Sequence, residues 1–360
     1  MPDAFEDENE DIELPEWIIK PSDILLKSTA LYGDSNTGKS TIIYHIFSVL
    51  KKYIPIFVVI SPTAASNGDY DGRVPEVLIF KEPTKEVFKA IYQRQEASAA
   101  FYRKANNLNV LESLYVKIRD NRTDSILRTI KSKKISALER AKRQYANDPS
   151  KREEECRVIN ETNDETMRNV FRISIRKHRD YLNRKYQLNE QQRYCLKFLD
   201  FNPNICLVMD DCAAQIKQWS KDESIGKIYY QGRHNYITSI YTFQHDKLLE
   251  TTFRQNVFNS IFTSEKSARA YFKRPTNNFD ATEQIRIMKM IKTTFSKDED
   301  KKYRKFAYLK ERKQPYNMFT AAKLPKFKVC FPFVQNYCEI VKSGEDVVDD
   351  DNPFMKSFLI

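Results

Sequence analysis

The 360-residue sequence has few glycines, and their distribution divides the chain. Only seven glycines occur, and none lies between residues 84 and 200, where Pro149 is the single proline. A stretch of this length that lacks both residues and is rich in Lys, Arg, Glu, Gln, Ala and Leu favours several long helices. We therefore predict a helical insertion over residues 84–200.

Long apolar runs and paired metal ligands are missing as well. No run of about 18 uncharged apolar residues exists, and the N-terminus is acidic, so we predict a soluble chain with no membrane span and no signal peptide. The six cysteines form no CxxC pair and have no histidine nearby. We expect free thiols in a reducing compartment rather than a zinc site or a disulfide framework.

Charge is distributed unevenly along the chain. Residues 84–200 contain 27 Lys and Arg against 16 Asp and Glu. The difference of +11 equals the net charge of the whole sequence. Such a segment is either a set of solvated charged helices or a polyanion-binding surface, and charge alone leaves both open. Acidic residues gather at the two ends, where we expect a disordered tail over residues 1–16 and an acidic C-terminal tail over residues 341–360.

The remaining residues, 17–83 and 201–340, alternate between buried strands and helical stretches. A helical spacing of apolar residues runs from 41 to 53. Alternation of this kind predicts an α/β core with a mainly parallel sheet flanked by helices. The predicted strand segments are 24–26 with 30–32, 54–60, 77–80, 205–209, 237–243 and 257–262, with 305–310 and 328–333 as further candidates.

A glycine-rich motif lies between the first predicted strand and the helix that follows it. GxxxxGK[ST] uses its glycines to let successive backbone N–H groups surround a phosphate chain, while the lysine reaches the terminal phosphates and the hydroxyl binds Mg²⁺. Gly33, Gly38, Lys39 and Ser40 fill these positions. We predict an ATP-binding segment that consists of Gly33, Asp34, Ser35, Asn36, Thr37, Gly38, Lys39, Ser40 and Thr41.

Two carboxylates follow the apolar strand 205–209. Asp210 is predicted to hold Mg²⁺ through Ser40 or through water, as the acidic element of such ATPases requires. Asp211 is then placed to polarise the attacking water, although its side chain is one methylene shorter than the usual glutamate. The alternative is an acidic cap on the helix that follows.

Two further side chains flank the predicted strand 237–243. Gln244 follows it, where an amide can hydrogen-bond the γ-phosphate or the attacking water. Arg233 precedes it, and we interpret this residue as a candidate arginine finger for a neighbouring subunit, since such a residue supplied in trans is worth about 10³ to 10⁵ in rate. A strand-ending glutamine and a surface arginine are the simpler interpretations. No Asn-Lys-x-Asp element follows the motif, so adenine is favoured over guanine.

Taken together, the Gly33–Ser40 motif, Val208-Met209-Asp210-Asp211, Gly232-Arg233-His234 and Ser239–Gln244 resemble the genome-packaging ATPases of nucleocytoplasmic large DNA viruses, the poxvirus-type branch of the FtsK–HerA superfamily. The resemblance covers roughly residues 24–83 and 203–275. It implies a RecA-like P-loop ATPase core of the additional-strand type, with ATP and Mg²⁺ as ligands. In it, Lys39, Asp210, Asp211, Arg233 and Gln244 are the implied catalytic residues.

The resemblance further implies an oligomeric ring of identical subunits that translocates double-stranded DNA into a capsid, with a capsid or portal protein as a further partner. The expected location is the host cytoplasm, at the viral factory, or the virion. Two alternatives remain at this stage. One is another FtsK–HerA DNA translocase or helicase, and the other is a non-catalytic P-loop scaffold protein.

Overall fold

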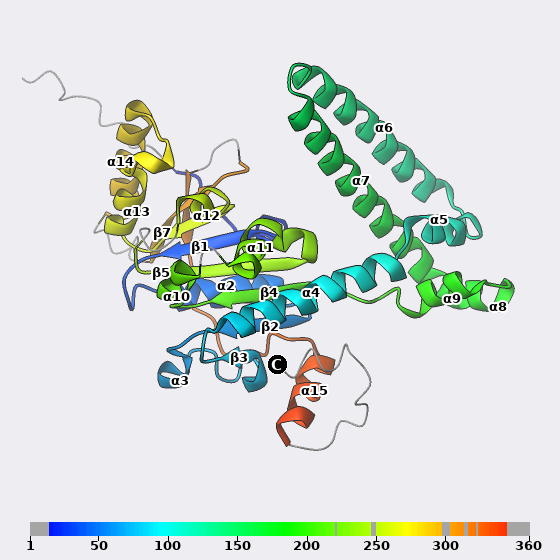
Figure 1. Cartoon of the computed structure of the whole chain (residues 1–360), viewed down its shortest axis with the longest axis horizontal. Coiled ribbons are helices and arrows are strands. Elements are labelled where there is room, and N and C mark those ends of the chain that lie inside the picture. Colours follow the sequence, from blue (N-terminus) through cyan, green and yellow to red (C-terminus); the bar gives the residue numbers. More distant parts are fainter. Residues whose placement is uncertain are drawn as a thin grey trace, which may run out of the picture. The chain divides into compact units, whose positions relative to one another are not determined.

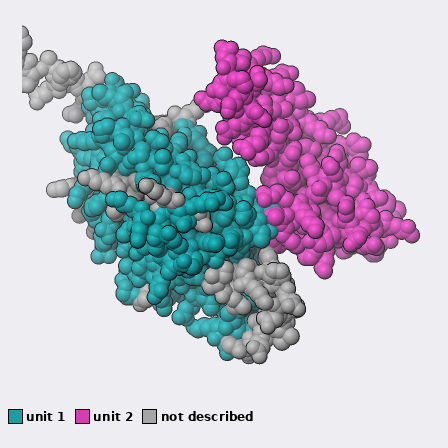
Figure 2. All heavy atoms as spheres, in the orientation of Figure 1, with its two compact units in different colours: residues 1–99, 203–360 teal, residues 100–202 magenta. Residues whose placement is uncertain are grey.

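The computed structural model describes residues 14–219, 222–245, 250–296, 303–312, 316–321 and 323–343. The chain divides into two compact units. Unit 1 comprises residues 1–99 and 203–360, and unit 2 comprises residues 100–202 (Figure 2). Within the described residues, no helix combines the length and the apolar character needed to cross a membrane.

Unit 1 contains a single sheet in which eight strands are described, in the order β3-β2-β4-β5-β1-β6-β7-β8 (Figure 1). Neighbours from β3 to β6 pair in parallel, and β7 and β8 add an antiparallel edge. The strands are β1 (Ser28–Tyr32), β2 (Ile56–Ile60), β3 (Ile79–Phe80), β4 (Ile205–Met209), β5 (Ile237–Phe243), β6 (Asn259–Phe262), β7 (Arg304–Leu309) and β8 (Tyr316–Thr320).

The central strands are buried along their whole length. Every residue of β2, β4 and β5 is buried, which explains why these segments are near-continuous apolar runs rather than alternating ones. Helix α2 (Lys39–Leu50) packs into the same core, where the ring of Phe47 lies 4.9 Å from that of Phe57. The predicted α/β fold with a mainly parallel sheet flanked by helices is confirmed.

Other helical segments of unit 1 surround this sheet (Figure 1). They are α1 (Pro21–Ile24), α3 (Ala64–Asn67), η1 (Glu76–Leu78), α10 (Ala213–Gln218), α11 (Glu223–Gln231), η2 (Gly232–Asn235), α12 (Thr251–Gln255), α13 (Glu265–Phe272), η4 (Pro275–Asn277), α14 (Ala281–Thr294) and α15 (Pro332–Ser343).

Two predicted strand segments are wrong. Residues 24–26 form the end of α1 and a turn, because Pro21 starts a helix with its preset φ and Leu26 has a φ of 60°, which no extended strand allows. Residues 328–333 form no strand either. The N–H groups of Val329 and Phe331 bond to the carbonyls of Arg73 and Pro55, which lie outside the sheet, and α15 begins at Pro332.

The predicted tails lie mostly outside the described residues. Of the N-terminal tail, residues 14–16 are described, and Glu16 forms a parallel bridge with Met318 of β8. The N–H of Trp17 donates a 2.7 Å hydrogen bond to the Met318 carbonyl, so the chain is attached to the antiparallel edge from this point. Of the C-terminal tail, residues 341–343 complete α15, and residues 344–360 lie outside the described part.

Unit 2 is helical, and the prediction of helices for residues 84–200 is confirmed. Its apolar core is formed by side chains such as Leu114, Phe171 and Leu199, which are at most 1% exposed. The first half of α4 belongs to unit 1, since Phe88 and Ile91 pack in that unit's core. The helices are α4 (Lys85–Ala105), α5 (Leu108–Val116), α6 (Asn121–Gln144), α7 (Pro149–Lys177), α8 (Arg179–Lys185) and α9 (Glu190–Lys197).

Candidate nucleotide-binding site

The glycine-rich motif forms the connection between β1 and α2. β1 ends at Tyr32 and α2 begins at Lys39. Because β1 lies between β5 and β6, this loop opens at the carboxyl edge of the parallel strands, where such sheets bind ligands. The free N–H groups at the start of α2 favour an anion there. The other predicted ATP-binding residues, Asp34, Ser35, Asn36, Thr37, Ser40 and Thr41, lie in this loop or in the first turn of α2.

Both glycines of the motif are required by their surroundings. A Cβ on Gly33 would lie 1.7 Å from Oγ1 of Thr263 and 2.9 Å from Oγ1 of Thr37. Gly38 has a φ of 92°, in the left-handed region that favours glycine, and it is the N-cap of α2. The loop is therefore a cradle that a side chain at either position would fill or distort.

The ammonium group of Lys39 lies inside this cradle. Its Nζ donates hydrogen bonds of 2.7 Å and 2.8 Å to the carbonyls of Gly33 and Asp34. Burial lowers the pKa of Lys39, and the charges of Asp210 and Asp211 oppose that shift. The structure thus brings the predicted lysine into electrostatic range of both predicted acids.

Asp210 is fixed by hydrogen bonds to both of its carboxylate oxygens. The Tyr70 hydroxyl donates to one oxygen at 2.8 Å, and the Thr242 hydroxyl donates to the other at 2.6 Å. The side chain is buried, with 9% of the residue exposed. A buried carboxylate needs such donors, and here they also set its orientation toward the loop.

Asp211 has an unusual backbone conformation. Its φ is 57°, in the left-handed region that few residues other than glycine, asparagine and aspartate adopt. Its N–H donates a 3.0 Å hydrogen bond to Oγ1 of Thr242, the same hydroxyl that donates to Asp210. Thr242 therefore links both acids, and the Asp211 side chain remains exposed to solvent.

A third carboxylate, that of Asp69, lies next to the hydroxyl of Ser40 in the glycine-rich motif. The Ser40 hydroxyl donates a 3.4 Å hydrogen bond to an Asp69 carboxylate oxygen. The Tyr44 hydroxyl donates to the Asp69 backbone carbonyl and holds this segment against α2. Burial raises the pKa of Asp69, and the charge of Asp210 adds to the shift.

Thr242, Asp69 and Tyr70 were missed by sequence reasoning. Thr242 belongs to an apolar strand, and no spacing rule marks it. The segment that holds Asp69 and Tyr70 is bounded by Gly68 and Gly72, whose φ values of 58° and 71° form turns that few other residues allow. This pair of glycines is the one local signal that a constrained loop follows β2.

The residues present fit a magnesium nucleotide. Mg²⁺ at a P-loop takes one or two protein oxygens and completes its coordination with phosphate oxygens and water. Ser40, Asp210 and Asp69 supply hydroxyl and carboxylate oxygens at this place. Within the described residues, no group of three or more His, Cys, Asp and Glu side chains is arranged to hold a metal without such a ligand.

Gln244 and Arg233 lie at opposite ends of β5. Gln244 follows Phe243, whose carbonyl accepts a 3.0 Å hydrogen bond from the N–H of Gly33, so it is adjacent to the loop. Arg233 is in η2, before the strand. β5 has seven residues, and at about 3.3 Å per residue its ends are roughly 20 Å apart. Within one chain, Arg233 is therefore not part of the site.

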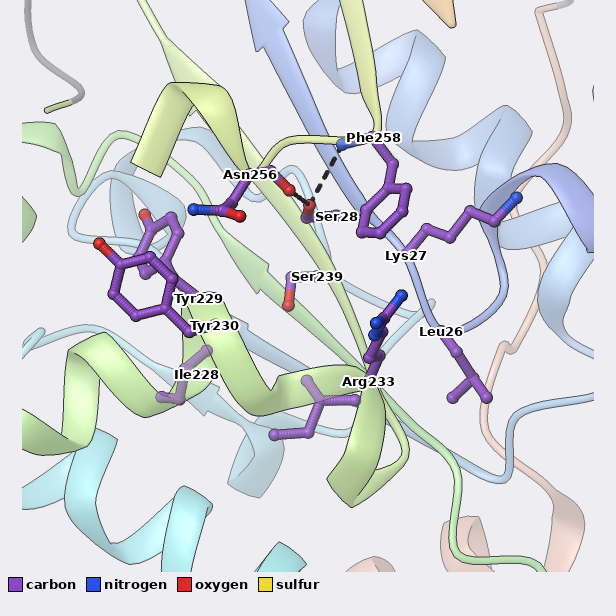
Figure 3. A pocket seen from close by; sticks show the side chains of 11 residues that line it. Leu26, Lys27, Ser28, Ile228, Tyr229, Tyr230, Arg233, Ser239, Asn256 and Phe258 are labelled. Carbon is purple, nitrogen blue, oxygen red and sulfur yellow. Dashed lines mark hydrogen bonds between the residues drawn. The ribbon is translucent and has the colours of Figure 1, made fainter. Parts of the chain in front are cut away.

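Arg233 lines a pocket at the amino edge of the parallel strands instead (Figure 3). Its exposed side chain extends toward Phe258, and the guanidinium lies 5.8 Å from the centre of that ring. Ser28 and Ile237, the first residues of β1 and β5, line the same pocket. The predicted finger thus lies at the edge of the sheet opposite to the glycine-rich loop.

Comparison with known proteins finds viral relatives. The chain is 27% identical over 362 residues to the uncharacterized protein B354L of African swine fever virus, covering 96% of this chain and 97% of that protein. It is also 33% identical over 92 residues to the uncharacterized protein L437 of Acanthamoeba polyphaga mimivirus, covering 26% of this chain and 32% of that protein. No protein-family model matches the sequence.

Solved structures of low similarity were also found. EssC (ATPases 2 and 3) from Geobacillus thermodenitrificans has a TM-score of 0.36 at 11% identity, covering 90% of this chain and 45% of that chain. The pCW3 conjugation coupling protein TcpA has a TM-score of 0.35 at 10% identity, covering 95% and 73%. The order of the strands and the loop between β1 and α2 define the fold.

The central role of Thr242 predicts the effect of Thr242→Val. This change removes a donor to Asp210 and an acceptor for Asp211, and we expect it to lower the free energy of unfolding by about 1–3 kcal/mol, as for other buried groups left without a partner. Affinity for magnesium ATP should fall as well, because both acids lose their position. Urea denaturation and equilibrium binding of ATPγS measure the two effects.

Thr238→Val is the matched control for this prediction. Thr238 lies in the same strand, and among the described residues its hydroxyl accepts a hydrogen bond only from the Leu26 N–H, at the far edge of the sheet. The control should lose stability and keep nucleotide affinity. Equal affinity in the two variants would contradict the role given to Thr242.

Proposed function

We propose that this chain is an ATP-hydrolysing motor that translocates double-stranded viral DNA into a capsid. The observation that supports it best is the convergence of Lys39, Ser40 and Asp210 at one edge of the parallel sheet, in a cradle open to a phosphate chain. The viral relatives and the motif resemblance favour genome packaging among the tasks of such motors.

The residues of the site suggest a division of roles in ATP hydrolysis. Lys39 and a magnesium ion held by Ser40 and Asp210 would neutralise the charge that develops on the transferred phosphoryl group. Asp211, exposed beside Asp210, would orient the attacking water, and Gln244 would contact the γ-phosphate. Asp69 offers a second carboxylate on the magnesium side, next to Ser40.

Lys39→Ala should abolish ATP turnover, because the variant loses the cation that faces the terminal phosphates. We expect a loss on the order of 10²-fold or more, the size associated with removal of one preorganised charge-stabilising group. Phosphate release measures the rate, and circular dichroism verifies the fold. Lys52→Ala, an exposed lysine just beyond α2, is the control and should keep the wild-type rate. A similar rate in both variants would show that ATP is not hydrolysed at this site.

We further propose that the chain works as a homo-oligomeric ring in which Arg233 reaches the nucleotide of a neighbouring subunit. The support is geometric, since Arg233 lies at the amino edge of the sheet and the P-loop at the carboxyl edge. A head-to-tail arrangement of subunits would place the amino edge of one sheet against the carboxyl edge of the next. Repetition of that contact around a closed rotation gives a ring.

Mixed oligomers test the role of Arg233. Arg233→Ala should bind ATPγS normally and lose turnover by about 10³-fold, as expected for a missing arginine finger. Mixing it with Lys39→Ala subunits should restore measurable turnover, because an intact P-loop then meets an intact arginine across some interfaces. A wild-type rate for Arg233→Ala, or no recovery in the mixture, would contradict action in trans.

Helix α6 of unit 2 is the part of the chain best suited to grip DNA. It contains eight basic residues and two acidic ones, whereas α7 contains seven basic and six acidic residues. Arg128, Lys133 and Arg140 are exposed and form no ion pair with any described residue. Unpaired cations on a rigid helix bind phosphates regardless of base sequence, as a translocating motor requires.

A change of Arg128, Lys133 and Arg140 to glutamine should weaken binding to a DNA duplex. The plot of log affinity against log salt has a negative slope, and each lost phosphate contact makes it shallower by about 0.9. The control replaces the exposed α7 residues Lys151, Arg157 and Lys177 with glutamine, which removes the same charge. Fluorescence anisotropy across a salt series measures both variants. Equal losses of affinity in the two variants would show that net charge, and not the position of α6, determines binding. Unchanged affinity in both variants would show that these residues of unit 2 do not bind DNA.

Location and partners follow from the same proposal. A packaging motor would act at the viral factory in the host cytoplasm and at the virion, against a capsid or portal protein. Turnover stimulated by double-stranded DNA supports the motor. Stimulation only by single strands would indicate a helicase, and absence of turnover with ATP bound would indicate a scaffold.

A further inference from the structure

Lys305 lies in β7, directly beside the phosphate-binding loop. Its Nζ donates a 3.0 Å hydrogen bond to the carbonyl of Thr37. The same atom would be 3.7 Å from a Cβ placed on Gly38, the N-cap of α2. Lys305 is 8% exposed, so the ammonium is held within the site rather than on the surface.

The antiparallel direction of β7 explains this position. Phe306 pairs with Phe262 at the end of β6, so Lys305 comes next to Thr263 just beyond it. The Thr263 hydroxyl lies 2.6 Å from that of Thr37 and closes the space around Gly33. The start of an antiparallel strand thereby reaches the carboxyl edge, where the parallel strands end.

The Lys305 ammonium has no counter-charge within the described part of the chain. No carboxylate described there forms an ion pair with it, and burial alone lowers its pKa. An ammonium has three donors, and one of them is used by Thr37. A buried cation without an anion is unfavourable, so the arrangement is one that a bound anion would complete.

Lys39 and Lys305 share the same local environment. Both donate to carbonyl groups of the loop, Lys39 to Gly33 and Asp34 and Lys305 to Thr37. Lys39 has Asp210 and Asp211 in electrostatic range, whereas Lys305 has neither among the causes of its pKa shift. A bound phosphate would therefore stabilise the Lys305 ammonium more than the Lys39 ammonium.

We propose that Lys305 is a second phosphate-binding lysine of this site, which contacts the phosphate chain of the nucleotide alongside Lys39. The inference rests on the proposed nucleotide binding and adds to it a cation from β7. Two positive side chains, from α2 and from the antiparallel edge, then hold the nucleotide from two different elements.

A bracing role for Lys305 makes different predictions from a phosphate-binding role. If Lys305 only holds the Thr37 carbonyl, a neutral donor suffices, and Lys305→Gln keeps the wild-type affinity for the nucleotide. If its charge binds phosphate, Lys305→Arg keeps much of that affinity, while Lys305→Gln and Lys305→Met lose it. Removal of an uncompensated buried charge should also leave the nucleotide-free protein as stable as before or more stable.

The experiment measures binding of ATPγS and ADP, with magnesium, to the full-length chain and these three variants. Lys310→Met is the control, because Lys310 directly follows β7 and its ammonium bonds, within the described part of the chain, only to the Gln255 carbonyl. We expect Lys305→Gln and Lys305→Met to bind ATPγS roughly 10- to 100-fold more weakly, the range for a lost hydrogen bond to a charged group. Lys310→Met should match the wild type.

Thermal unfolding without nucleotide gives the second readout. The melting temperature of Lys305→Met should be unchanged or higher, while the rise that ATPγS induces should shrink. Wild-type affinity in Lys305→Gln, or a lower melting temperature without nucleotide in Lys305→Met, would overturn the inference. Absence of ATPγS binding in the wild type and in Lys310→Met would instead overturn the proposed function, and the inference with it.

Discussion

The parallel pairing of β1 with β5 is the contact on which the site depends. It places Tyr32 beside Phe243, so that the P-loop leaves the sheet next to Thr242. β5 also pairs with β4, which brings Asp210 and Asp211 within hydrogen-bonding distance of the same threonine. Because parallel strands all end at one edge, three segments far apart in the sequence deliver a cation, a hydroxyl and two carboxylates to one place.

The antiparallel edge extends this site rather than merely closing the sheet. Thr263, directly after β6, fills the space that makes Gly33 obligatory, and Lys305, the second residue of β7, donates to the Thr37 carbonyl of the same loop. The loop is thus enclosed by side chains from strands that carry no recognisable nucleotide motif. Arg233, at the other edge, completes no site within its own chain, and this is why an oligomer is central to the proposal.

Unit 2 poses a separate physical problem, because it is a helical unit with most of its excess charge on one helix. Its core, built around Leu114 and Phe171, accounts for its fold. The basic residues of α6 take no part in that core, and all of them except Lys134 are exposed. Packing does not require these charges, and the proposed binding of DNA gives them a role.

The local sequence determined much of this protein. Apolar runs marked most of the strands, the absence of glycine marked the helices of unit 2, and glycine spacing marked Lys39 and Ser40. The turn at Leu26 and the course of residues 328–333 escaped prediction, since a short apolar run is compatible with strand, turn or loop until its partners are known. Only the tertiary structure placed Asp69, Tyr70, Thr242 and Lys305 at the loop, because their roles depend on strand order and direction, and no residue spacing encodes these.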